Sequence, residues 1–288
     1  MTFTTNIDPV DIVVHTASSA VPGHPTGFIK ALAQRRQKTS QEVYYIHSSI
    51  TALFTSEAGW PYGYVKDTDT DILAKEKQIG TANPVRATDI VVVDQAKLHN
   101  VQAFNVVVPM VYGTGSGEWK KVSQNIPSQL RASLKNKLVR KFEQDAASPA
   151  VHISDLTALY ALLVSKIVAG NVLPHNQRGY FFAFVHRARW HETMHRLAQA
   201  LRQRGLIDTP EVGVWPSYEE AAEHLGWPPQ HARAMATNEG QLVAVQAYEQ
   251  LGWQPKWTEQ MYLDSMDEEI DGVLEHDKYE PTLYKALE

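Results

Sequence analysis

The chain has 288 residues, of which 43% are hydrophobic and 20% are charged, a composition typical of a globular protein with one large or two modest domains. Its formal net charge of −5 offers no broad attraction for nucleic acid or for an anionic membrane. Zero cysteines exclude disulfides and Cys-based metal sites and fit a reducing compartment, so we expect a cytoplasmic protein. The sequence opens without a signal-peptide pattern, and the best apolar stretch, Leu156–Ala169, is too short to span a membrane.

Two apolar runs with a helical pattern between them open the first half. Val10–Thr16 predicts a strand that is buried on both faces. Phe28, Ile29 and Leu32 form one stripe of a predicted helix. Glu42–Ser49 predicts the next strand. A strand, a helix and a strand at this spacing form a βαβ unit, so we expect two parallel strands with a right-handed crossover.

The pattern then alternates between loop, helix and strand. Residues 55–83 resemble a loop, because glycine, proline and alternating aspartate and threonine interrupt any helical or strand periodicity of apolar residues. A helix is predicted from Pro84 to Asn100, with proline in its first turn. A third buried strand is predicted over Ala103–Tyr112.

The remaining elements predict a second, smaller unit. A fourth short strand around Ala150–Ile153 leads into a helix whose start Ser154 and Asp155 can cap. A strand near 180–185 and a helix beginning near Trp190 follow. The order of elements predicts an α/β protein with a parallel sheet and a smaller α+β C-terminal lobe.

The domain boundaries follow from this change of pattern. We expect residues 1–170 to form the sheet domain, with an insertion from the lobe around 113–149. Residues 171–288 are expected to form the C-terminal lobe on the substrate side. No repeat or flexible linker separates the two parts.

Five segments follow one another in a distinctive order: Asp11–Ala17, Tyr45–Ser49, Val108–Gly113, Val151–Leu156 and Leu251–Lys256. Their order and spacing resemble those of extended or atypical short-chain dehydrogenases/reductases, most closely the NAD-dependent epimerase/dehydratase group. The resemblance covers nearly the whole chain. It implies a Rossmann-type parallel sheet, NAD(P) as cofactor and a small-molecule substrate in the C-terminal lobe.

The resemblance also implies where the cofactor lies, at the ends of the first strands. The residues it assigns to the cofactor are Thr16, Ala17, Ser18, Ser48, Pro109, Met110 and Tyr112. The family's first strand, its Gly-rich turn and the next two strands have no counterpart, so we expect a sheet that lacks its first strands and weak NAD(P) binding. The strand Val10–Thr16 then becomes an exposed edge, through which we expect homodimers or larger self-association.

The family's catalytic Tyr-x-x-x-Lys pattern is displaced in this chain. On the helix that should carry it, Val85 and Asp89 stand at the matching positions. A literal Tyr-x-x-x-Lys occurs upstream, in Tyr62 and Lys66. With Ser49 to orient a carbonyl and Tyr62 to donate the proton, these three are the candidate catalytic residues. Chance occurrence of the pattern in a loop is the alternative.

Three functions remain open from the sequence. The first is an NAD(P)-dependent oxidoreductase or epimerase-like protein that acts on a small carbonyl or alcohol, or an inactive form of one because the Gly-rich turn is missing and the site is altered. The second is a non-catalytic binding or regulatory relative, or a truncated gene product. The genomic sequence upstream of Met1 would distinguish a truncated product from a complete one.

The third function is a zinc hydrolase. His191, Glu192 and His195 match the H-E-x-x-H pattern on a predicted helix, with Glu219, Glu220 or Glu223 as a third ligand. The apolar residues of the same helix explain the segment as packing, and we therefore assign no metal.

Overall fold

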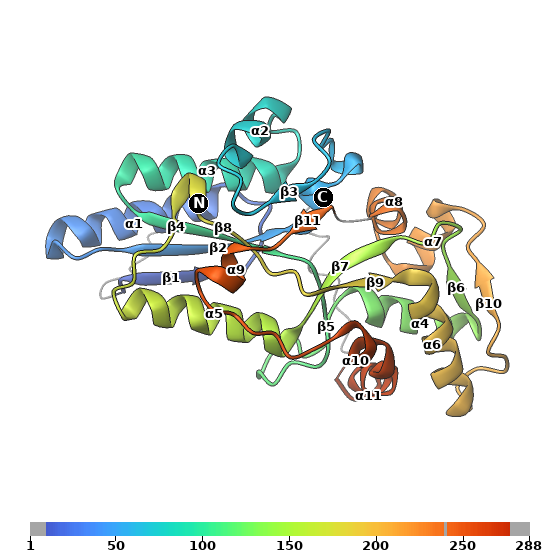
Figure 1. Ribbon diagram of the computed structural model, residues 1–288. Coiled ribbons are helices and arrows are strands. Elements are labelled where there is room, and N and C mark those ends of the chain that lie inside the picture. The colour runs from blue at the N-terminus through green and yellow to red at the C-terminus, as the bar shows by residue number, and fades with distance from the viewer. Residues whose placement is uncertain (1–9, 239–240, 277–288) are drawn as a thin grey trace.

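The computed structural model describes residues 10–238 and 241–276. Figure 1 shows a sheet flanked by helices at one end and a smaller lobe at the other. The strands are β1 (Ile12–His15), β2 (Tyr44–Ile50), β3 (Val65–Lys66), β4 (Gln102–Val108), β5 (Met110–Tyr112), β6 (Val139–Lys141), β7 (Ala147–His152), β8 (Tyr180–Phe182), β9 (His186–Arg189), β10 (Val212–Val214) and β11 (Leu242–Val243). The helices are α1 (Gly23–Thr39), α2 (Ile72–Ile79), α3 (Pro84–His99), α4 (Asn125–Asn136), α5 (Ile153–Val168), α6 (Trp190–Gln203), α7 (Tyr218–Leu225), α8 (Pro229–Thr237), α9 (Gln246–Glu249), α10 (Glu259–Asp264) and α11 (Met266–His276), with short 3-10 turns η1 (Thr51–Phe54), η2 (Ser56–Ala58) and η3 (Asn176–Arg178).

The main sheet has the order β1-β2-β4-β8, and all its neighbouring strands are parallel. The predicted βαβ unit is confirmed as β1, α1 and β2. Strand β1 stands at one end of this order, and Val14 on it is 42% exposed. The expected association through this edge stays a prediction.

Helices cover both faces of the main sheet, as Figure 1 shows, with α1 and α3 on one face and α5 on the other. Tyr45 and Ala103 belong to the apolar cluster that includes residues of α1 and α3. The next residue on each strand, Ile46 and Phe104, belongs to the cluster that includes residues of α5. Successive side chains of a strand point to opposite faces, so these strands carry apolar residues toward both layers of helices.

The predicted third strand is in fact two strands, divided at Pro109. Strand β4 lies in the main sheet, whereas β5 pairs with β7 in a separate sheet of order β5-β7-β9. Proline has no N–H to donate to a ladder, so pairing changes at this residue. The predicted fourth strand is confirmed as β7, in this second sheet.

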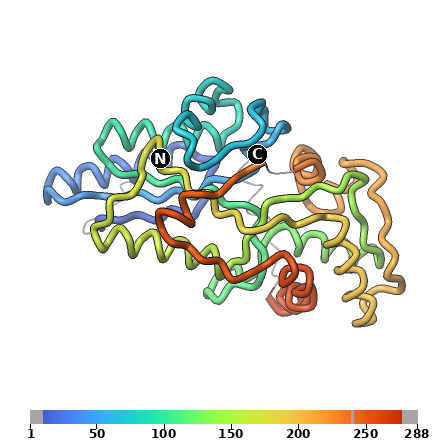
Figure 2. The backbone as a smooth tube through the Cα atoms, viewed as in Figure 1, coloured from blue at the N-terminus to red at the C-terminus, as the bar shows by residue number. Residues whose placement is uncertain are grey.

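The prediction of a loop over 55–83 is only partly right. The segment contains helix α2 and strand β3, which pairs with β11 from the far end of the chain. Figure 2 shows this late segment reaching the early part of the chain.

Immediately after β3, the Asp67 carboxylate accepts hydrogen bonds from the backbone N–H groups of Phe182 (3.1 Å), Val245 (2.8 Å) and Gln246 (3.1 Å). Burial raises the pKa of Asp67 to about 6, although these bonds act in the opposite direction.

The start of α5 also differs from the prediction. Its N-cap is His152, whose Nδ1 accepts from the Ser154 N–H, so Ser154 and Asp155 do not cap it. The buried Asp155 carboxylate instead accepts from the backbone N–H groups of Lys256 (3.0 and 3.1 Å) and Trp257 (2.9 Å). Asp155 therefore fastens the C-terminal segment to the helix.

The smaller lobe packs around α6. Trp190, Met194, Leu197 and Leu201 are buried in one cluster with residues of α4, α7, α8 and α11, as the apolar stripe predicted. Strand β8 lies beyond the predicted boundary at residue 170 and yet belongs to the main sheet. The sheet thus takes in part of the predicted C-terminal unit.

Helix α11 contacts the end of β5 through a buried carboxylate. The Gly113 N–H donates to Glu269 Oε1 at 2.5 Å. Gly113 has φ of +87°, and a Cβ there would lie 2.1 Å from His152 Nε2, so only glycine fits. Burial raises the pKa of Glu269 to about 7.

The raised pKa of Glu269 predicts a loss of stability at higher pH. The folded protein holds this proton more tightly than the unfolded chain, so the contribution is present below pH 4.5 and is lost as pH rises through about 7. At 1.36 kcal/mol per pKa unit, the loss is at most about 3 kcal/mol. We expect Glu269→Gln to flatten this part of the pH dependence, measured by urea unfolding from pH 5 to pH 8. An unchanged slope in the variant would refute the assignment.

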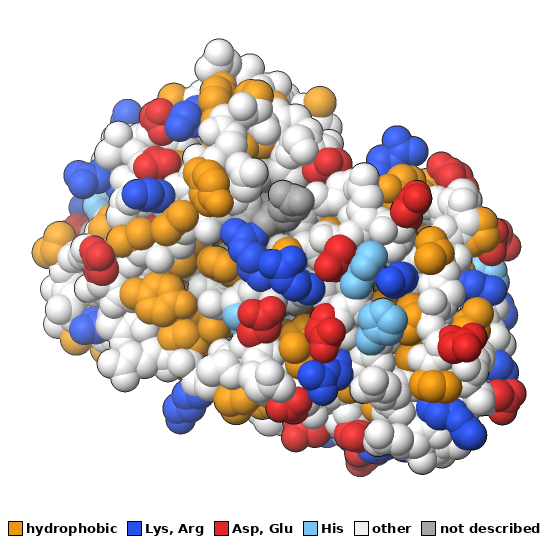
Figure 3. Space-filling model, turned by 45° about the vertical axis from the view of Figure 1, so that its right-hand side comes forward, with side chains coloured by type: hydrophobic (Ala, Val, Ile, Leu, Met, Phe, Trp, Pro, Cys, Tyr) orange, Lys and Arg blue, Asp and Glu red, His pale blue; other side chains and the backbone are white. Residues whose placement is uncertain are grey.

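Among residues 10–238 and 241–276, no helix has the length and apolar character needed to cross a membrane. Figure 3 shows positive and negative side chains interspersed on one face of the molecule.

Candidate functional site

A cavity of about 680 Å³ lies at the carboxyl ends of β1, β2 and β4. The loop after β1 contributes small side chains, and the end of β2 contributes the hydroxyls of Ser48 and Ser49. Val108 of β4 and residues in the first turns of α5 line other parts of its wall. Ligands of open parallel sheets bind at this edge, because crossover loops leave a crevice there.

Ser48 joins the main sheet to α5 at the wall of this cavity. Its Oγ donates to the carbonyl oxygen of His15 at 3.1 Å and lies 2.6 Å from the Tyr160 hydroxyl. Burial raises the pKa of Tyr160 to about 12, so the phenol stays neutral at physiological pH. Because Ser48 donates to His15, the Tyr160 hydroxyl is the donor to Ser48 Oγ, and both oxygens remain available as acceptors for a polar ligand.

Ser49 faces the opposite side of β2 and has a different partner. Its Oγ donates to Oδ2 of Asp89, which α3 places against the strand. His47 Nε2 lies 3.3 Å from the other carboxylate oxygen, Oδ1. Ser49, Asp89 and His47 are all buried. A strand that alternates faces thus sends one serine toward α5 and the next toward α3.

A second buried carboxyl lies near Asp89. Burial and the nearby Asp89 raise the pKa of Glu76 on α2 well above its usual range. The Tyr180 hydroxyl donates to Glu76 Oε2 at 2.6 Å. The buried guanidinium of Arg86 is the cation acting on both carboxyls, and its Nη2 donates to the carbonyl oxygens of Leu53 (3.0 Å) and Ala58 (2.8 Å). The interior beside the cavity therefore carries a charged network.

The structure gathers part of the predicted cofactor set. The predicted residues that line the cavity are Thr16, Ala17, Ser18 and Ser48. Pro109, Met110 and Tyr112 are not among its lining residues, although Val108 immediately before them is. Tyr112 is fully buried, and its hydroxyl pairs with His186 Nε2 at 2.9 Å.

The predicted catalytic residues are not gathered in one cavity. Ser49 lines the cavity described above, and Tyr62 and Lys66 do not. The Tyr62 hydroxyl donates to Gln78 Oε1 at 2.8 Å, and the Lys75 ammonium lies 5.3 Å from the centre of its ring. Lys66 is exposed on β3. Their assignment as a proton-transfer pair stays a prediction.

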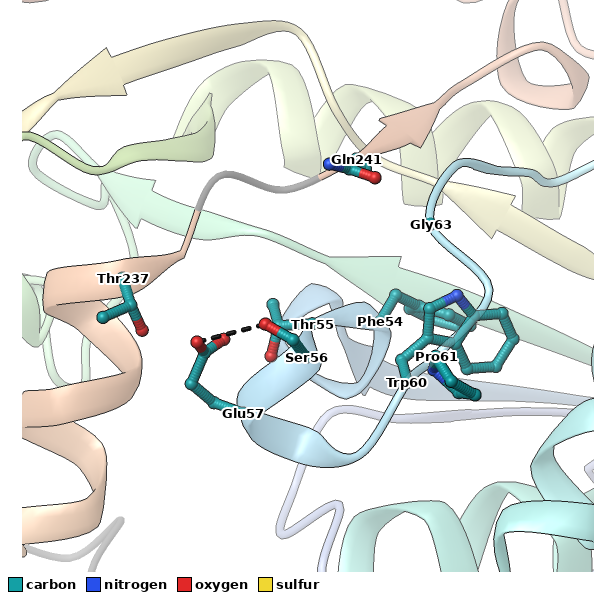
Figure 4. Close-up of a pocket in the computed structure, with 9 residues that line it drawn as sticks. All are labelled: Phe54, Thr55, Ser56, Glu57, Trp60, Pro61, Gly63, Thr237 and Gln241. Atoms are coloured by element: carbon teal, nitrogen blue, oxygen red, sulfur yellow. Dashed lines mark hydrogen bonds between the residues drawn. The ribbon is translucent and has the colours of Figure 1, made fainter.

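A second hollow, of about 380 Å³, lies between η2 and α8. Figure 4 shows Glu57 directed toward Thr237, with Phe54, Trp60 and Pro61 on the other side. The Glu57 carboxylate accepts from Ser56 Oγ at 3.1 Å. Polar groups and aromatic rings meet here.

The H-E-x-x-H segment lies on α6, as predicted, but its side chains contact protein groups. His191 Nε2 lies 2.9 Å from the carbonyl oxygen of Phe142, and Glu192 pairs with Arg196 at 2.9 Å. Within the described part of the chain, no group of three or more His, Cys, Asp or Glu residues could hold a metal ion.

Sequence reasoning missed Tyr160, Glu76 and Arg86. Tyr160 lies on a helix of mainly apolar residues, and the hydroxyl at the end of its ring is the one sequence signal of a polar contact there. Glu76 and Arg86 look like surface residues in the sequence. Only the packing of α2 and α3 buries them.

The cavity lining fits part of a nicotinamide cofactor. Thr16, Ala17 and Ser18 leave space beside the strand ends, and Ser48 and Tyr160 carry hydroxyls that can bond ribose hydroxyls or a carboxamide. Small side chains with a few polar groups are typical of such sites.

Comparison with solved structures gives the class of fold. A dTDP-glucose 4,6-dehydratase (DesIV double mutant) from Streptomyces venezuelae, with NAD and DAU bound, matches with a TM-score of 0.58 and 14% identity over 93% of this chain and 74% of that one. A UDP-glucose 4-epimerase from Thermotoga maritima, with UDP-glucose, matches at 0.57 and 14% over 92% and 78%. RMD from Pseudomonas aeruginosa, complexed with NADPH, matches at 0.53 and 13% over 91% and 81%. No protein-family model and no curated protein sequence matches the chain.

The chain therefore shares the Rossmann-type fold of these solved structures, with a parallel main sheet flanked by helices. The likeness to NAD-dependent epimerases and dehydratases that the segment order predicted is confirmed at the level of the fold.

Proposed function

We propose that this chain is an NAD(P)-dependent oxidoreductase or epimerase-like protein that acts on a small carbonyl or alcohol. The observation that carries the proposal is the cavity at the carboxyl ends of β1, β2 and β4, whose lining combines small and hydroxyl-bearing side chains with apolar ones and with Lys120. Ser48 and Tyr160 would hold the polar part of the cofactor next to the strand ends. When bound, the nicotinamide would supply or accept a hydride.

The second candidate is a non-catalytic relative that binds the same ligand. It is favoured by Val85 and Asp89 on α3, which stand where the family pattern places tyrosine and lysine. Valine has no proton to transfer, and aspartate carries the charge opposite to that of lysine. Turnover of NADH or NADPH with a panel of small aldehydes and ketones separates the two candidates.

A cavity-filling variant tests ligand binding directly. Ala17 is exposed at the cavity wall, so an indole at this position occupies ligand space without disturbing the core. We expect Ala17→Trp to raise the Kd for NADH or NADPH at least about tenfold, which corresponds to about 1.4 kcal/mol. Titration followed by calorimetry or nicotinamide fluorescence measures this change.

The matched control is Ala74→Trp, which places the same side chain at an exposed position on α2. It should bind the dinucleotide as the unmodified chain does. Equal affinity of Ala17→Trp and the unmodified chain would move the ligand site elsewhere. Absence of NADH and NADPH binding at millimolar concentration in the unmodified chain would reject the proposed function.

A further inference from the structure

The cavity at the strand ends holds a tyrosine that a ligand can reach. Tyr160 lies halfway along α5 and Ser48 near the end of β2, and both residues line the cavity of about 680 Å³. Both side chains are only partly buried. The hydroxyl of Ser49, in contrast, is bonded to Asp89 on the other side of the strand, and Ser49 is 1% exposed. The phenol of Tyr160 is therefore the hydroxyl to consider for proton transfer to a ligand.

The hydroxyls of Tyr160 and Ser48 form a directed chain of hydrogen bonds. Ser48 Oγ donates to the His15 carbonyl oxygen at 3.1 Å, so the Tyr160 hydroxyl, 2.6 Å from Ser48 Oγ, is the donor in the other pair. If Tyr160 gives its proton to a ligand, the Ser48 hydroxyl can turn from His15 to the phenolate oxygen. Burial raises the pKa of Tyr160 to about 12, and the hydrogen bond to Ser48 acts in the opposite direction.

We propose that Tyr160 is the proton donor for the reduction of a small carbonyl compound and that Ser48 positions it. The inference rests on the proposed function for its cofactor and its substrate. Helix α3 has Val85 and Asp89 where the family pattern places tyrosine and lysine, and α5 supplies a phenol from the opposite face of the sheet (Figure 1). The ribose and carboxamide of the cofactor can donate to the same two oxygens, which brings the nicotinamide end beside this phenol.

The reaction balances in protons and electrons. The carbonyl carbon receives a hydride, with its electron pair, from the reduced nicotinamide, and the π bond breaks toward oxygen. That oxygen takes the Tyr160 proton as the phenol O–H bond breaks. The products are an alcohol, an oxidised nicotinamide and a phenolate that accepts from Ser48, and water then returns the proton to Tyr160.

The proton affinities favour this direction. An alkoxide binds a proton about as tightly as hydroxide does, and the pKa of water is about 15.7, so a phenol with a pKa of about 12 gives up its proton to it. The neutral phenol cannot take a proton from an alcohol. At neutral pH we therefore expect a higher kcat for reduction of a carbonyl than for oxidation of the corresponding alcohol.

The test follows the loss of NADH or NADPH absorbance with a panel of small aldehydes and ketones, at dinucleotide concentrations that saturate each variant. Tyr160→Phe keeps the ring and should lower kcat about 10²–10⁴-fold, the usual worth of a positioned proton donor. Ser48→Ala should also lower kcat, yet change the Kd for the dinucleotide by no more than about tenfold, the most that one neutral hydrogen bond contributes. Ser48→Thr keeps the hydroxyl and should restore kcat, which a purely structural role of Ser48 would not require.

The matched control is Tyr248→Phe. Tyr248 packs against the same apolar cluster as Tyr160, and its hydroxyl donates to the Phe184 carbonyl oxygen at 3.0 Å. Tyr248 is not one of the described residues that line the cavity. This variant removes the same oxygen atom from the same cluster and should leave kcat unchanged.

Each result decides the matter. An unchanged kcat in Tyr160→Phe would overturn the proposal, and a loss of activity in Tyr62→Phe instead would assign the proton donor to the upstream pattern. If Tyr160→Phe fails to fold, an equal kcat of Ser48→Ala and the unmodified chain overturns it. A chain that binds the dinucleotide and reduces no compound of the panel would also overturn it, while the cofactor site stands. Absence of dinucleotide binding would reject the proposed function and this inference together.

Discussion

Arg86→Met is expected to lower the free energy of unfolding by about 3–5 kcal/mol, the range for removing one partner of a buried charged network. The guanidinium is 2% exposed and donates to the carbonyl oxygens of Leu53 and Ala58. Without it, these oxygens lose their donor, and Glu76 and Asp89 lose a nearby cation. Urea unfolding followed by tryptophan fluorescence measures the change.

The control for this experiment is Lys77→Met. Lys77 pairs with Asp94 at 2.7 Å, but both side chains are almost half exposed. Such a surface pair contributes about 0–1 kcal/mol. If Arg86→Met cost no more than Lys77→Met, the buried network would not stabilise the fold.

Asp155→Ala is expected to be comparably damaging, at about 3–5 kcal/mol. Its carboxylate accepts from the backbone N–H groups of Lys256 and Trp257, and hydrogen bonds to a charged group contribute about 1.5–3 kcal/mol each. Removal also releases the segment that holds Trp257, whose ring stacks on His152 at 3.8 Å. The same urea titration measures the loss.

Asp155→Asn gives a graded comparison, because the amide keeps one oxygen acceptor of nearly the same shape. We expect it to lose less stability than Asp155→Ala. An alanine variant as stable as the unmodified chain would mean that the segment around Trp257 is held by its other contacts.

The sequence predicted the elements that are marked by a local signal, such as a helix cap, or by a long apolar pattern. The spacing of β1, a helical stripe and β2 predicted parallel strands. The expectation that the first strand is buried on both faces was wrong, because β1 stands at the edge of the sheet and Val14 is 42% exposed. Pro84 predicted the start of α3, and the Asn83 side chain caps it. The stripe around Trp190 predicted the inward face of α6.

What the sequence could not predict depends on distant partners. Strand β3 has two residues and exists through its pairing with β11, so no local pattern marks it. The break at Pro109 lies inside a continuous apolar run, since both of the resulting strands are buried. The candidate site has the same limit: Ser49 and Asp89 were both noted, but their hydrogen bond joins residues 40 positions apart.

The junction at Asp67 has a consequence for the order in which the chain is made and folded. Two of its three donors, in Val245 and Gln246, lie 178 and 179 positions later. During synthesis, β3 and Asp67 must therefore wait for most of the protein before their partners exist. Contacts of such long sequence separation close late and slow folding. Until then β3 lacks its pairing partner β11, and the Asp67 carboxylate lacks two of its three donors. The junction of β3, β11 and Asp67 is therefore expected to form late in folding.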